Sequence, residues 1–157
     1  MKKILYIVIF AFVISSAHSQ KDNPLKEGMP NTIKLRSGEV IYDLNGEWDA
    51  VYEGGVLEVN KDIVKITQID NQFIGTYLLY GDGAVGKNMQ KVKGKLKANV
   101  IDEIFLHEIT NSMTRSLDWI PSDAIISEDG NEIKITSLVL ENGATKDINL
   151  SLNRKLK

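Results

Sequence analysis

Apolar and polar residues alternate along most of this chain, and this period-two pattern restricts its fold more than any other feature. From about residue 32 onward, stretches of alternation are separated by residues that favour turns. The alternation is unbroken over 146–154, and residues 47–53 place Trp48 and Tyr52 on one face. Side chains of a β-strand point alternately to opposite sides of the sheet, so the pattern indicates strands with one buried face.

Turn dipeptides separate the expected strands. Asp129-Gly130 and Asn142-Gly143 each lie between two apolar stretches. Gly and Asn tolerate the positive φ angles that tight hairpins need. No stretch combines capping residues with the apolar spacing of an amphipathic helix. The sequence therefore predicts an all-β protein, an antiparallel up-and-down β-barrel of about eight strands, with another small barrel or a sandwich as the alternative.

The first 19 residues have the features of a secretory signal peptide. Two lysines precede an apolar run over 4–14, and the small residues Ala17 and Ser19 follow it. The run is shorter than the roughly 20 apolar residues that cross a bilayer, so we expect no transmembrane anchor. We expect cleavage before Gln20 and export to the periplasm or the exterior.

Removal of 19 residues from 157 leaves 138, which suits a single domain of ordinary size. We expect an arm or linker over 20–31, which contains proline and glycine, and one barrel domain over 32–157. The signal peptide holds two of the 19 basic residues and none of the 21 acidic ones, so the mature chain has 17 against 21 and a net charge of −4. This balance gives no reason to expect a nucleic-acid partner, and we expect a monomer. The absence of Cys excludes disulfides.

Three segments invite a functional interpretation. Residues 81–88 nearly match a phosphate-binding loop, but Asn88 replaces the Ser or Thr that holds magnesium, so we interpret them as a hairpin loop. Lys91, Lys93, Lys95 and Lys97 alternate with apolar or small residues and predict a strand with one basic, solvated face. The roles of loop 81–87 and of segment 107–123, which is either a bent strand or a loop over one end of the barrel, stay open.

Catalytic residue sets are scarce in this chain. His107 is the only histidine left after processing, and Cys is absent. Zinc ligand sets and Cys–His pairs are therefore unavailable, and no G-x-S-x-G motif supplies a serine nucleophile. We expect His107 to be structural, and we expect no enzyme activity, no metal and no cofactor.

A short motif at each end of the barrel region resembles the calycin superfamily. Gly46 and Trp48 form the G-x-W motif that begins the first barrel strand in lipocalins, and Arg154 matches the arginine that closes the last strand. The resemblance implies a barrel in which Arg154 packs across Trp48. It favours the short bacterial lipocalin-like domains over the classical lipocalins, whose later T-D-x-Y motif is missing here.

An eight-stranded barrel is wide enough to hold one small ligand or to be filled by its own side chains. By their parity, Tyr52, Phe73 and Tyr77 are candidates to face the interior and to bind a small apolar ligand, with Trp119 as a further contact. The alternative is a protein-interaction module with a filled barrel, such as an inhibitor of a secreted hydrolase or a cell-envelope component. In that case residues 119–121 form its exposed apolar loop.

Overall fold

The computed structural model describes residues 25–26, 28–53, 62–79, 88–111, 116–141 and 143–155. Every regular element in these ranges is a β-strand, which confirms the all-β prediction. The strands are β1 (Thr32–Lys34), β2 (Val40–Tyr42), β3 (Gly46–Glu53), β4 (Asp62–Ile69), β5 (Gln72–Leu79), β6 (Gln90–Lys97), β7 (Val100–Asn111), β8 (Ser116–Ile126), β9 (Glu132–Glu141) and β10 (Ala144–Arg154).

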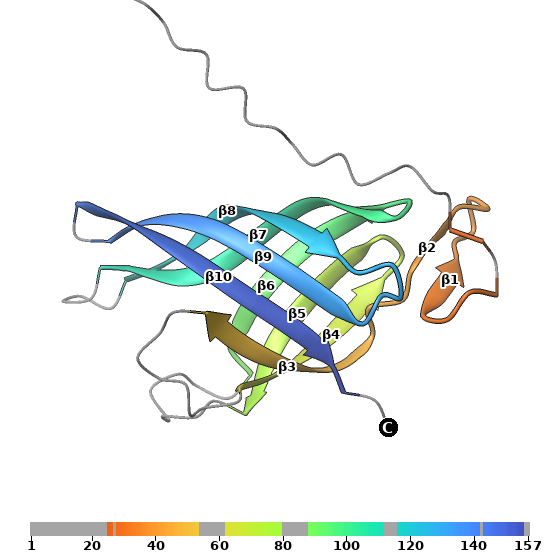
Figure 1. Ribbon diagram of the computed structural model, residues 1–157, viewed down its shortest axis with the longest axis horizontal. Helices are drawn as coiled ribbons and strands as arrows, with labels where there is room; N and C mark the ends of the chain where they lie inside the picture. Colours follow the sequence, from red (N-terminus) through yellow and green to blue (C-terminus); the bar gives the residue numbers. More distant parts are fainter. Residues whose placement is uncertain are drawn as a thin grey trace, which may run out of the picture.

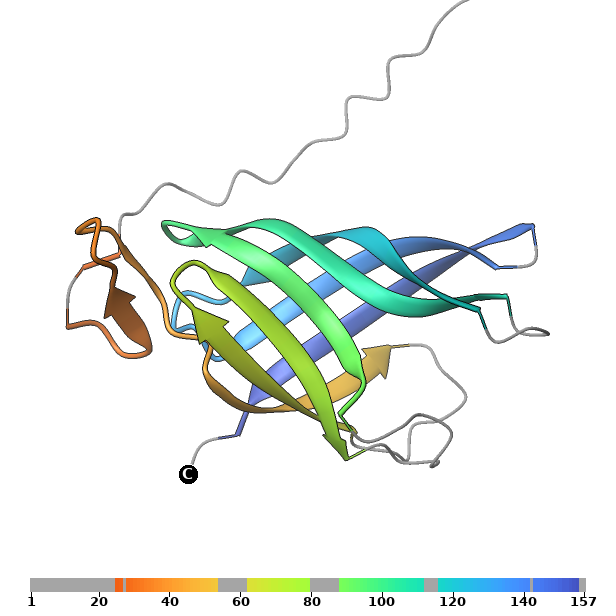
Figure 2. The same cartoon turned by 180° about the vertical axis from the view of Figure 1, so that it is seen from behind.

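Strands β3 to β10 form a closed antiparallel barrel in which each strand pairs with its neighbours in the sequence (Figure 1). The last strand, β10, returns to β3, with Arg154 opposite Trp48 and Leu150 opposite Tyr52. This up-and-down topology is the one that the alternation and turn residues predict. The short strands β1 and β2 pair only with each other and form a separate hairpin at one end of the barrel (Figure 2).

The two ends of the barrel differ. At one end, which we call the capped end, lie the turns 70–71, 98–99 and 127–131 and the hairpin β1–β2 (Figures 1 and 2). At the opposite end, which we call the distal end, β3, β5 and β7 finish and β4, β6 and β8 begin.

The hairpin β1–β2 and the segment that follows it close the capped end. Ile41 and Leu44 are completely buried. The amide of Gln68, which faces inward from β4, accepts a hydrogen bond from the Leu44 N–H and donates one to the carbonyl oxygen of Tyr42. The Tyr42 hydroxyl donates to the carbonyl oxygen of Glu128 at 3.1 Å. Because these bonds satisfy buried polar groups of chain segments far apart in the sequence, they fix the hairpin on the barrel.

The middle of the barrel is a solid core. Two glycines face inward at positions where a side chain has no room. A Cβ on Gly94 would lie 2.7 Å from the Phe73 ring and 2.3 Å from the carbonyl oxygen of Glu103, and one on Gly75 would lie 2.6 Å from Val92. Phe73 and Val92 occupy the space that the glycines leave, as expected in a barrel whose strands coil strongly.

Some expectations concern residues outside the described ranges. They are the signal peptide over 1–19, residues 20–24 and 27 of the arm, and the glycine-rich loop over 81–87. Within the arm, Leu25 is described and packs partly buried against the core.

Candidate functional site

Trp48 and Arg154 meet at the capped end. The guanidinium carbon of Arg154 lies 4.5 Å from the centroid of the Trp48 ring, within cation–π range. The same guanidinium donates to the carbonyl oxygens of Asn45 at 2.9 Å, of Gly130 at 3.3 Å and of Asp43. Burial lowers the pKa of Arg154. The resemblance to the calycin superfamily predicts this contact, and its bonds to the segment 43–45 and to the turn at Gly130 give Arg154 the structural role of joining the last strand to the first.

A polar cluster lies inside the barrel at the distal end. It consists of Tyr52 from β3, Tyr77 from β5, Lys91 from β6 and Glu108 from β7. The Lys91 ammonium forms an ion pair with the Glu108 carboxylate and lies 5.0 Å from the centroid of the Tyr52 ring. The Tyr52 hydroxyl donates to Glu108 at 3.2 Å and lies 3.5 Å from the Tyr77 hydroxyl. We call these four residues the distal cluster.

Lys91 reaches the interior because β6 contains a β-bulge. Gly75 pairs with Val92 and Thr76 pairs with Gln90, so Lys91 is the extra residue between the two pairs. Lys91 and Val92 are both buried as a result. The prediction that Lys91 shares a solvated face with the next three alternating lysines is therefore wrong, because strict alternation holds only where no residue is inserted.

The distal cluster is strongly desolvated. The side chains of Lys91 and Glu108 are 3% and 14% exposed. Burial lowers the pKa of Lys91, and the attraction of Glu108 and Asp62 opposes that effect. Burial raises the pKa of Tyr52 well above its ordinary value, and the neighbouring Tyr77 and Glu108 add to the rise. The cluster is thus a buried ion pair with two phenolic hydroxyls beside it.

The structure brings together only two of the four predicted ligand contacts. Tyr52 and Tyr77 belong to the distal cluster. Phe73 faces inward as predicted, but it precedes Tyr77 by four residues of strand, which is about 13 Å, and it packs on Gly94 in the middle of the barrel. Trp119 lies on the outer face, so it is separated from the other three by the wall of the barrel.

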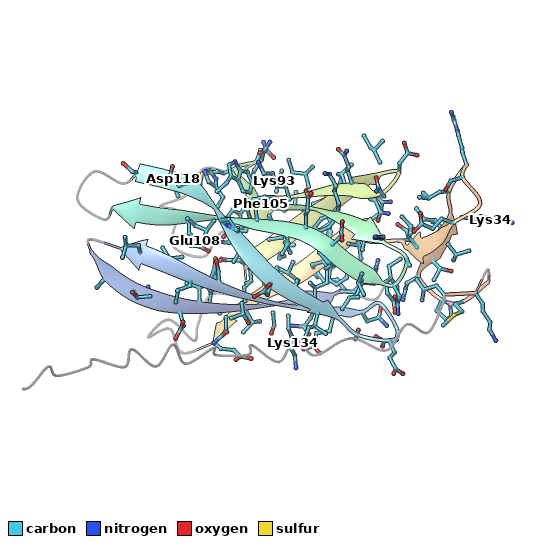
Figure 3. All side chains as sticks on the ribbon, turned by 90° about the horizontal axis from the view of Figure 1, so that it is seen from above. Lys34, Lys93, Phe105, Glu108, Asp118 and Lys134 are labelled. Atoms are coloured by element: carbon cyan, nitrogen blue, oxygen red, sulfur yellow. The ribbon has the colours of Figure 1, made fainter. Side chains whose placement is uncertain are left out.

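Trp119 belongs to an aromatic group on the outside. Its ring stacks on His107 with 4.6 Å between centroids and an interplanar angle of 17°. The Lys93 ammonium lies 4.2 Å from the centroid of the Trp119 ring and 5.5 Å from that of Phe105. Figure 3 shows Lys93 and Phe105 together on one side of the barrel, well apart from Lys134. The sequence does not place aromatic residues among these lysines, but strand pairing brings them there from β7 and β8.

Segment 107–123 is not a loop over the end of the barrel. Its described residues belong to β7 and β8, which pair with His107 opposite Trp119 and Phe105 opposite Pro121. Residues 112–115, between the two strands, lie outside the described ranges. Glu108 lies an even number of residues from Ile104 and Leu106, whose side chains face inward. The alternation along β7 was therefore a sequence signal that could have placed Glu108 in the interior. No sequence signal marks the bulge that turns Lys91 inward.

Among the described residues, no three side chains of His, Cys, Asp or Glu gather as metal ligands would. The same ranges contain no helix of the length and apolar character that crosses a bilayer.

Comparisons with known proteins give no relative. No family model matches the chain, and neither a curated protein nor a solved structure matches it. The fold and the geometry of its sites are therefore the basis for a functional proposal.

Proposed function

We propose that this protein is an exported, non-enzymatic β-barrel that binds a small, neutral and mainly apolar ligand at its distal end. The observation that carries the proposal is the distal cluster. A buried ion pair contributes little to stability, because desolvating two charges costs several kcal/mol per ion before their attraction offsets it. A purely apolar interior would serve the fold as well, and a few polar groups placed among apolar walls are what orients a ligand in a small-molecule site.

The chemistry of the cluster favours a ligand without net charge. Lys91 pairs with Glu108, and the buried carboxylate of Asp62 also attracts it, so no cation is left for an anionic ligand and a cationic one would have to be desolvated. The Tyr52 hydroxyl donates its proton to Glu108 but can accept a hydrogen bond, and the Tyr77 phenol is a group that can donate or accept one. A ligand with one hydroxyl or carbonyl group suits these partners.

The surroundings favour an apolar body for the ligand. Leu106, two residues before Glu108 on β7, is completely buried, and Ile120, which pairs with it on β8, is partly buried. Apolar walls with a few placed polar groups are typical of small-molecule sites. Because the middle of the barrel is filled, the ligand would enter the distal mouth and not the whole length of the barrel.

Two further parts of the proposal rest on the sequence. The charged start and short apolar run support export, with removal of residues 1–19. The Trp48–Arg154 contact supports kinship with the calycin superfamily, in which an arginine of the last strand packs on the tryptophan of the first. Kinship would make a binding function the natural expectation, although fold alone does not define a ligand.

The test is a calorimetric titration of the mature protein with decan-1-ol, which measures the affinity for this neutral ligand. Replacement of one phenolic hydroxyl in Tyr77→Phe should weaken binding about tenfold, because a ligand hydrogen bond is lost while the ring stays. Tyr42→Phe is the matched control, since Tyr42 lies at the capped end and its hydroxyl bonds to the backbone there. Native mass spectrometry of protein taken from its own compartment should also detect a co-purified neutral molecule. If neither experiment detects a ligand, the proposal fails.

One observation favours the protein-interaction module as a second candidate. Leu138 and Leu140 point outward from β9, and each is 62% exposed. Two neighbouring leucines on an outer sheet face suit a partner surface better than they suit solvent. If they contact a partner, Leu138→Ser together with Leu140→Ser should abolish its capture from the envelope fraction without changing binding of decan-1-ol.

A further inference from the structure

A groove on the outer face of the barrel, separate from the distal cluster, has the composition of a binding site. It crosses strands β4 to β7 and has a volume of about 430 Å³. Volumes of this order suit small molecules. The apolar side chains that line it include Ile69, Ile74 and Phe105, and the charged ones are Lys93, Lys95 and Glu103.

The apolar lining lies where the barrel faces solvent. Ile69 is 74% exposed, and Ile74 and Phe105 are partly buried. All three occupy positions whose side chains point out of the barrel, so packing of the core does not require them to be apolar. A ligand that covers them would remove this surface from water, which is favourable in proportion to its area.

The charge of the groove is positive and comes from one residue. The carboxylate of Glu103 lies 3.0 Å from the ammonium of Lys95, so these two neutralise each other. Among the described residues, no carboxylate lies within 4.0 Å of the Lys93 ammonium, which is held over the rings of Phe105 and Trp119. The groove thus presents one fixed cation beside an apolar surface.

This combination selects among anionic ligands. A peptide would need partners for its backbone N–H and C=O groups, but the floor is formed by β5 and β6, whose backbones already pair on both sides. An acidic sugar would need partners for many hydroxyls, and only Thr67 and Gln72 add neutral polar side chains to the lining. An acyl chain has no polar group to satisfy apart from its carboxylate.

We propose that this outer groove binds the anion of a medium- or long-chain carboxylic acid. Its carboxylate pairs with the Lys93 ammonium, and its chain covers Ile74 and Ile69. The site is distinct from the distal cluster, because that cluster lies on the other side of the barrel wall and its one ammonium is already paired with Glu108. The inference therefore stands or falls independently of the proposed function.

The test uses dodecanoate below its micelle concentration, with tryptophan fluorescence as the readout. Only two tryptophans are present, and Trp48 is completely buried at the capped end, whereas Trp119 contacts Lys93. Dodecanoate should change the emission with saturation, and Trp119→Phe should remove the change. Lys93→Met should weaken binding about tenfold, because it removes the charge and keeps an unbranched chain over the rings. Lys134→Met is the control, since Lys134 is an exposed lysine on β9 away from the groove.

Several results would overturn the inference. Equal affinity for dodecanoate and dodecan-1-ol would show that the charge of Lys93 is not used. Loss of dodecanoate binding in Tyr77→Phe would place the ligand in the distal cluster instead. Binding to vesicles of anionic phospholipid without binding to free dodecanoate would assign the groove to a membrane surface. The inference expects Tyr77→Phe to leave dodecanoate binding unchanged while it weakens binding of decan-1-ol.

Discussion

Replacement of Lys91 by methionine should strongly destabilise the protein. Methionine keeps most of the apolar volume of the lysine stem but leaves the Glu108 carboxylate, 14% exposed, without its cation. Breaking a buried ion pair from one side costs about 3–5 kcal/mol. For a mature chain of this size, that corresponds to a fall in Tm of roughly 10–15 °C.

The double variant Lys91→Met with Glu108→Gln should recover most of that loss. Glutamine carries no charge, so no unpaired charge is left buried. Its side-chain carbonyl oxygen can still accept a hydrogen bond from the Tyr52 hydroxyl. We expect the double variant to lie within about 2 kcal/mol of the wild type, because removal of a whole buried pair is often nearly neutral. Urea unfolding followed by circular dichroism measures all three free energies. The account of the cluster is refuted if Lys91→Met costs less than about 1 kcal/mol or if the two substitutions simply add.

Three further predictions concern the capped end. Arg154→Ala should lower the free energy of unfolding in urea by about 3 kcal/mol, because it removes the stacking on Trp48 and hydrogen bonds to three carbonyl groups. Arg154→Lys should recover only part of this loss. An unchanged midpoint of unfolding would contradict the role of Arg154 in joining the last strand to the first. Gly130→Ala should cost about 2 kcal/mol by the same assay, because φ at this position is +69° and a Cβ would lie 2.8 Å from the Tyr42 ring. Hydrogen bonds from Ser127 and Asn131 lower the pKa of the Asp129 carboxyl group below its ordinary value of 3.8. The ionised carboxylate therefore stabilises the folded protein fully above pH 3.8, and this stabilisation is lost as the pH falls through the lowered pKa. The Tm difference between wild type and Asp129→Ala should therefore shrink towards zero in strong acid, and a difference that persists there argues against this carboxylate.

The strands could be predicted because each depends on local alternation. The observed β3 and β10 begin and end within two residues of the expected stretches 47–53 and 146–154. Arg154 shares the parity of Leu150 and Leu152, so its inward direction followed from the pattern, whereas its contact with Trp48 was implied by the resemblance to the calycin superfamily. Closure into a barrel is the pairing of β10 with β3, a contact between distant segments that the turns alone do not distinguish from a sandwich.

The distal cluster could be predicted only in part. Tyr52 and Tyr77 followed from parity, but Lys91 did not, because a single inserted residue reverses the side of the sheet to which it points. The outer group of Lys93 with Trp119 depends on pairing between three strands and their register. Such non-local contacts leave no trace in the alternation of any one strand.

The central claim is that the distal mouth of the barrel binds a neutral apolar ligand. Its most direct test is a titration of the isotope-labelled mature protein with decan-1-ol, in which two-dimensional NMR measures the changes in the backbone amide chemical shifts. The account predicts saturable shifts at Tyr52, Tyr77 and Glu108, with none at Trp48 at the capped end. Absence of shifts at the distal end, or shifts confined to the outer groove around Lys93, would contradict it.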